Sequence, residues 1–205
     1  LDEELDRNHP KNYFLSRILD FITCDGIVLV VKRDFENLPG FAIPYKLKSG
    51  QASDPQIYDR KDQRLASEEW GSAFVEFTKK NSKPLNLHLL ASFEKGGEEL
   101  VGTSFLLSLK VAMWRMEKKV SLHPLEFGIT GGLNAQSGEI EMVRSLLSKS
   151  ECAQNYGAFL FVAPSLRPET KDQPKEDGLT AWINVQNKSL DECMQMIRSQ
   201  AARMW

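Results

Sequence analysis

The sequence predicts a single α/β domain of the α+β kind, in which helices pack on mixed β-sheets. Its 205 residues are enough for one substantial hydrophobic core. Segments with the periodicity of strands and of helices alternate through the second half. No internal repeat or low-complexity tract interrupts them. We therefore expect one domain over residues 1–205, with a β-rich part carrying one helix over 1–84 and an α/β part over 85–205.

The N-terminal part contains strand and helix patterns on either side of a polar stretch. Residues 26–32 (GIVLVVK) are β-branched and apolar, which predicts a buried strand. Residues 48–65 combine charge with Ser, Gly and Pro and lack apolar periodicity, which predicts a solvated loop. Ser67 is expected to cap a helix whose first turn holds two glutamates. The apolar stripe of that helix comprises Trp70, Ala73, Phe74 and Phe77.

The second half continues this alternation of patterns. Alternating leucines over residues 85–89 predict a strand that ends near Phe93. Helices are expected over residues 104–116, over a segment that ends near Tyr156 with Gly157 as C-cap, and after the capping box SLDE at 189–192. Further strands are expected over 125–129, 139–143, 158–163 and 180–185, and a Pro-rich, charged loop over 164–178.

Composition and motifs exclude several classes of function. The 26 basic and 28 acidic residues nearly cancel, so no overall field attracts nucleic acid or an anionic membrane. Apolar runs such as residues 27–31 are too short to span a bilayer, and residues 1–4 do not resemble a signal peptide. The three cysteines form no Cys-x-x-Cys pair, which favours a reducing compartment. The motifs for zinc proteases, nucleotide binding and α/β-hydrolases are missing, so no cofactor or metal is expected.

Two polar residues stand out against the apolar patterns around them. Ser104 follows Gly102 and Thr103 where a turn is expected to enter a helix. Free backbone N–H groups there could stabilise the oxyanion that forms when a serine attacks a carbonyl, although serine is also an ordinary helix cap. Lys149 lies on the apolar stripe of its helix. It either extends its ammonium to solvent or is desolvated, in which case it could accept a proton from a serine near neutral pH.

Three segments resemble the birnavirus polyprotein-processing proteases, which belong to the Lon-like group of Ser/Lys proteases. The most specific is the segment FGITGGLNAQSGEIEMV at residues 127–143, followed by Ser148 and Lys149. Upstream, VGTS at 101–104 before an apolar helix resembles the nucleophile segment of that group. Residues 183–190 resemble its closing strand and helix. The similarity covers residues 85–197 and implies a Lon proteolytic-domain-like fold.

The resemblance implies a catalytic site. It gives Ser104 as the nucleophile, Lys149 as the general base, and Thr130 as the hydroxyl that helps to hold the lysine. Backbone groups of Gly102, Thr103 and Ser104 would bind the oxyanion. The sequence departs from the group at Phe105, where Lon-type enzymes have a small residue. Ser108 is the alternative nucleophile, although inside a helix its amide would be engaged.

The resemblance also implies a biological role. The chain would be a serine endopeptidase that cuts its own viral polyprotein after small residues, often alanine, in the host cell cytoplasm. An extended peptide would bind by adding a strand beside the site. Two other interpretations stay open. One is a non-catalytic binding or scaffold module with the topology of ribosomal protein S5, and the other is an unrelated hydrolase whose base is His9, His88 or His123.

Overall fold

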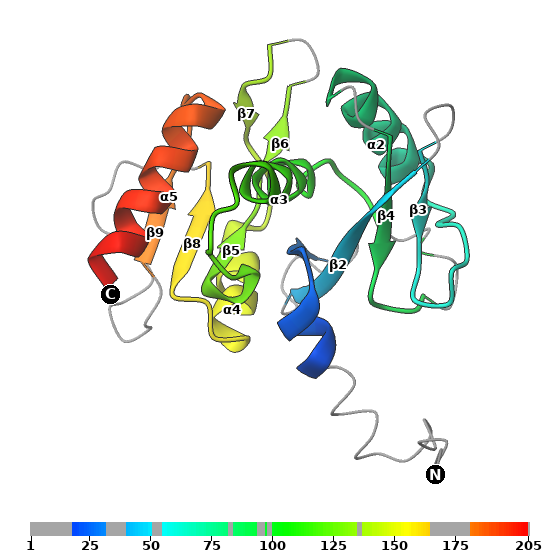
Figure 1. Cartoon of the computed structure of the whole chain (residues 1–205), viewed down its shortest axis with the longest axis horizontal. Helices are drawn as coiled ribbons and strands as arrows, with labels where there is room; N and C mark the ends of the chain where they lie inside the picture. The colour runs from blue at the N-terminus through cyan, green and yellow to red at the C-terminus, as the bar shows by residue number, and fades with distance from the viewer. Residues whose placement is uncertain are drawn as a thin grey trace.

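The chain folds into a single α+β domain with mixed sheets, which confirms the predicted fold class (Figure 1). The structure is a computed structural model. It describes residues 18–31, 40–50, 55–81, 84–93, 97, 100–134, 137–164 and 181–204. His9 and most of the expected loop over 164–178 lie outside these residues. The first described segment, residues 18–23, is helical.

The first sheet has four strands and one covering helix. Its strands are β1 (Gly26–Val30), β2 (Phe41–Ser49), β3 (Ile57–Tyr58) and β4 (Leu85–Leu89), in the order β1-β2-β4-β3. β2 is antiparallel to both β1 and β4, whereas β3 is parallel to β4. Helix α2 (Glu68–Asn81) packs its apolar stripe on the core of this sheet, as its periodicity predicts.

Two predictions for the N-terminal part are wrong. The expected loop over residues 48–65 contains β3, and Ile57 and Leu65 are buried there. These apolar residues lie too far apart in the sequence to produce a periodic signal. The expected division between residues 84 and 85 is also not a structural boundary, because β4 pairs with β2 and β3 inside the first sheet.

The second sheet is parallel. Its strands are β5 (Phe127–Ile129), β8 (Leu160–Ala163) and β9 (Ala181–Asn184), in the order β5-β8-β9. The short helix η1 (Pro124–Glu126) replaces the start of the strand expected over 125–129. Between β5 and α4 (Leu146–Asn155), the chain forms the antiparallel pair β6 (Gly132–Leu133) and β7 (Ile140–Glu141).

Helix α3 (Leu106–Lys118) joins the two halves of the domain and positions the residues before it. Figure 1 shows α3 nearly end-on between the two sheets. Leu106 and Leu109 pack in the core of the first sheet, whereas Leu107 and Val111 pack in the core of the second. Because both faces of α3 are buried, its N-terminus is held rigidly between the two cores.

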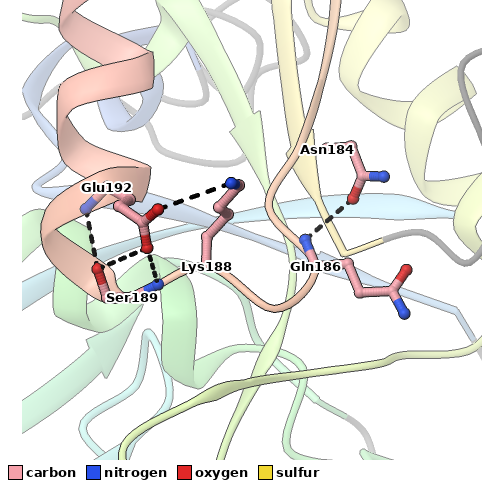
Figure 2. Close-up of polar contacts among 5 residues, drawn as sticks. All are labelled: Asn184, Gln186, Lys188, Ser189 and Glu192. Atoms are coloured by element: carbon pink, nitrogen blue, oxygen red, sulfur yellow. Dashed lines mark hydrogen bonds and ion pairs between the residues drawn. The ribbon is translucent and has the colours of Figure 1, made fainter.

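The last helix, α5 (Leu190–Met204), begins with the predicted capping box. Ser189 Oγ accepts a hydrogen bond from Glu192 N, and Ser189 N donates to the Glu192 carboxylate in return (Figure 2). Lys188 forms an ion pair with the same carboxylate. The end of α4 is also as predicted, since Gly157 follows it with a φ of +89°.

Candidate active site

Ser104 lies in the turn immediately before α3, two residues earlier than the helix itself begins. Its carbonyl accepts a hydrogen bond from Gly131 N at 3.0 Å, and Leu107 N donates to Gly131 O at 3.1 Å. These bonds fasten the turn to the chain that leaves β5. As a result, Thr130 is brought alongside Ser104.

The helix-cap interpretation of Ser104 is not supported by this geometry. The N-cap position of α3 is occupied by Phe105, and no side-chain hydrogen bond caps the helix. The Ser104 hydroxyl is therefore left for other contacts. Phe105, the departure from the Lon-type pattern, is fully buried and stacks on Trp70 with ring centroids 4.2 Å apart. The large Phe105 side chain is therefore accommodated in the hydrophobic core of the first sheet.

Lys149 projects from the buried face of α4 and is only 5% exposed. The helix lies very close to β5, because a Cβ added at Gly128 would lie 2.4 Å from the Cβ of Ala153. Cys152 and Ala153, one turn further along α4, are buried on the same face. The apolar stripe therefore carries the lysine inward and not toward bulk solvent.

The lysine amine and two hydroxyls meet at one point. Lys149 Nζ lies 2.9 Å from Ser104 Oγ and 3.3 Å from Thr130 Oγ1. Thr130 is fully buried, and its hydroxyl donates to Ser104 O at 3.5 Å, the long limit of a hydrogen bond. Thr130 therefore accepts from the amine while it contacts the backbone of the nucleophile. The structure brings together all three residues expected in the catalytic site.

Burial changes the acidity of the lysine. Desolvation lowers the pKa of Lys149 from 10.5 to about 8, since the charged ammonium is disfavoured away from water. Within the described part of the chain, no carboxylate forms an ion pair with this amine. A substantial fraction of Lys149 is therefore neutral at mildly alkaline pH and can accept a proton.

The pair opens into a cleft of about 390 Å³. One wall comes from Leu29, Val30 and Val31 at the end of β1, and another from residues 142–145 before α4. Ser104 and Lys149 both line the cleft. A substrate can thus reach the serine, while the stem of the lysine stays in the core.

Of the three backbone amides expected to bind the oxyanion, one already has an acceptor. The Gly102 amide donates to Glu69 Oε1 at 2.8 Å, so it is already engaged. Among the described residues, no acceptor is found for the amides of Thr103 and Ser104. These two N–H groups are the candidates for stabilising negative charge. In the sequence, Glu69 is only an acidic residue in the first turn of a predicted helix, where it needs no further explanation.

Ser108, the alternative nucleophile, has a structural environment. It is buried inside α3, where its hydroxyl donates to Ile27 O at 2.9 Å and lies 3.2 Å from Tyr45 Oη. It does not line the cleft that holds Lys149. The hydroxyl therefore links α3 to the first sheet.

The two described histidines are occupied elsewhere. His88, on β4, stacks on Tyr58 and pairs with Asp62. The His123 ring bonds Ile22 O through Nε2 and Leu125 N through Nδ1. Neither lines the cleft with Ser104, so neither supports a histidine base there.

The cysteines are free, and burial raises their pKa values. The thiols of Cys24, Cys152 and Cys193 are all buried, with pKa values raised to about 11, 12 and 12.

In the described ranges, no group of three or more His, Cys, Asp or Glu side chains could hold a metal ion. The described helices include none that is long and apolar enough to cross a membrane.

Comparison with known proteins adds no family to this description. No protein-family model matches the chain, and no curated protein is significantly similar to it.

Proposed function

We propose that the chain is a serine endopeptidase in which Ser104 is the nucleophile and Lys149 the general base. The contact of 2.9 Å between Lys149 Nζ and Ser104 Oγ carries the proposal. Three further properties support it. The lysine is desolvated, its pKa is lowered to about 8, and the serine lines a cleft that a peptide can enter.

The proposed reaction proceeds through an acyl-enzyme. Neutral Lys149 takes the Ser104 proton as the serine oxygen attacks the peptide carbonyl carbon. The amides of Thr103 and Ser104 hold the resulting oxyanion. The lysine ammonium then protonates the leaving nitrogen, the C–N bond breaks, and an ester forms on Ser104. Water attacks this ester, Lys149 accepts a proton from the water, and that proton returns to the serine oxygen as the acid product leaves.

The substrate proposed is an extended peptide that adds to the edge of β1. This strand ends the order of the first sheet, and in the described part no strand pairs with its other edge. Leu29 and Val30 of β1 line the cleft with Ser104. An added strand would be held by backbone hydrogen bonds, and some of its side chains would enter the cleft beside Leu29 and Val30. The preference for small residues on the acyl side rests on the sequence resemblance alone.

The biological role proposed rests on that resemblance to the birnavirus polyprotein-processing proteases. The substrate would be the viral polyprotein of which the chain is part, cut in the host cell cytoplasm. The three buried, free cysteines are compatible with a reducing compartment.

The test is cleavage of peptides with alanine before the scissile bond, followed by mass spectrometry of the products and of the intact chain. We expect products from the wild type and an acyl adduct on Ser104. Neither should form with Ser104→Ala or Lys149→Ala. Binding without any turnover in the wild type would instead indicate a binding module, and full activity of Lys149→Ala would indicate a different base.

A further inference from the structure

The first turn of α2 holds the segment that leads to the nucleophile at two buried points. Ser67 Oγ donates to Leu100 O at 2.7 Å and accepts from Trp70 N at 3.2 Å, so the helix cap also fixes the start of this segment. Trp70 stacks on Phe105 at its end. Leu100, Trp70 and Phe105 are each at most 1% exposed. Both ends of the segment are therefore anchored in the first core, and Ser104 lies between them.

Between these anchors, the chain turns through Gly102 in a left-handed conformation, with a φ of +83°. Glycine is the residue with the greatest backbone freedom, so this is the point at which the segment can most easily change conformation. The Gly102 amide is held there by Glu69 Oε1 at 2.8 Å. Both residues line the cleft with Ser104. One side-chain contact thus restrains the freest position before the nucleophile.

We infer that Glu69 is a positioning residue for the proposed reaction: its carboxylate fixes the Gly102 peptide so that the amides of Thr103 and Ser104 stay aligned for the oxyanion. The inference rests on the proposed function. Negative charge develops on the substrate oxygen only as Ser104 attacks, so alignment of these donors stabilises the transition state more than the bound substrate. Loss of Glu69 should therefore lower kcat and leave KM nearly unchanged.

Two substitutions separate the hydrogen bond from the charge. Glu69→Ala removes the acceptor and should reduce kcat by about 10- to 100-fold, somewhat less than the roughly 10²- to 10³-fold typical of deleting an oxyanion donor. Glu69→Gln keeps a carbonyl oxygen that can accept from Gly102 N, and should stay within about 3-fold of the wild type. Glu68→Ala is the matched control, because Glu68 is the neighbouring exposed acid on α2 and does not line the cleft.

Two further measurements distinguish positioning of the Gly102 peptide from a general loss of structure. They are the apparent pKa of the pH profile and the hydrogen-exchange rate of the Gly102 amide. The limb along which activity rises with pH should keep its apparent pKa in Glu69→Ala, because desolvation is what lowers the pKa of Lys149. Hydrogen exchange at the Gly102 amide, followed by NMR, should be faster in Glu69→Ala than in the wild type and Glu69→Gln. A raised KM with unchanged kcat would overturn the inference and show that Glu69 acts on the substrate.

Different results would exclude the positioning role of Glu69 and the peptidase activity of Ser104. Unchanged exchange at Gly102 in Glu69→Ala, or equal loss of kcat in Glu69→Gln and Glu69→Ala, would overturn the inference alone. Absence of Ser104-dependent cleavage in the wild type would overturn the proposed function, and with it the catalytic purpose of Glu69.

Discussion

Lys149 Nζ lies 2.9 Å from Ser104 Oγ, although 45 residues separate the two in the chain. The serine comes from the turn before α3 and the lysine from the buried face of α4. Because a buried lysine is costly without a partner, this placement needs an explanation. A proton-transfer pair provides one, since it requires an amine that is neutral near the working pH.

Ser104→Ala should remove nearly all peptidase activity, whereas Ser108→Ala should keep kcat. The reason is that Ser104 contacts the amine, while Ser108 bonds Ile27 O and lies next to Tyr45 Oη. Ser108→Ala leaves those buried groups without a partner and should lower the free energy of unfolding by about 1–3 kcal/mol. Peptide cleavage and urea unfolding of both variants measure this. The reverse assignment of activity to the two serines would contradict it.

Thr130→Val should lower kcat by about 10-fold, which corresponds to one hydrogen bond of about 1.4 kcal/mol. The valine keeps the shape of the side chain but removes the hydroxyl that accepts from Lys149 Nζ at 3.3 Å. Thr130→Ser keeps that hydroxyl and is the matched control. Steady-state kinetics of the two variants are compared with the wild type. Equal losses in both would show that packing of the methyl group matters more than the hydroxyl.

Lys149→Met should make the protein more stable at pH 7, and this advantage should shrink as the pH rises. The folded pKa of about 8 lies below the unfolded value of 10.5, so between these pH values the unfolded chain binds more protons and wild-type stability increases with pH. The free-energy penalty for burying the ammonium has its maximum value below pH 8 and disappears above pH 10.5. The difference between the variants should change by about 3 kcal/mol across this window. Urea unfolding at pH 7 and pH 10 measures it, and a constant difference would contradict the desolvation.

Gly128→Ala should reduce both stability and activity, because the new methyl group would push α4 away from β5. Its Cβ would lie 2.4 Å from the Cβ of Ala153, one turn after Lys149. Overpacking of this kind costs about 1–3 kcal/mol. Gly71→Ala is the control, since a Cβ at this α2 position meets nothing within 4 Å and should stabilise the helix by about 1 kcal/mol. Thermal unfolding and peptide cleavage check both, and unaltered activity in Gly128→Ala would show that the position of α4 is not critical.

Local patterns were sufficient for most elements of the fold. The stripe of α2, the capping box of α5 and the left-handed Gly157 after α4 are short-range features, and each was predicted from neighbouring residues. The position of β3 was missed because it depends on long-range pairing with β4. The division at residue 84 failed for the same reason.

The candidate site could be predicted only in part. Lys149 can be identified from the sequence, because a lysine is unusual on the apolar stripe of a helix. Its pairing with Ser104 and Thr130 comes from the resemblance. The contact of Glu69 with Gly102 joins residues 33 positions apart and has no sequence signal, because a glutamate in the first turn of a helix is ordinary. The contact of Phe105 with Trp70 likewise has no sequence signal, since it depends on how α2 packs on the N-terminus of α3.

The dependence of kcat/KM on pH, measured for the wild type and for Lys149→Arg, tests the Ser104–Lys149 pair most directly. Lys149 must be neutral to accept the Ser104 proton, so wild-type activity should rise with pH along one limb with an apparent pKa of about 8. Arginine keeps the positive charge but stays protonated at every accessible pH, so Lys149→Arg should be as inactive as Lys149→Ala. Measurable cleavage by Lys149→Arg with an unchanged pH profile would contradict the role of Lys149 as the base.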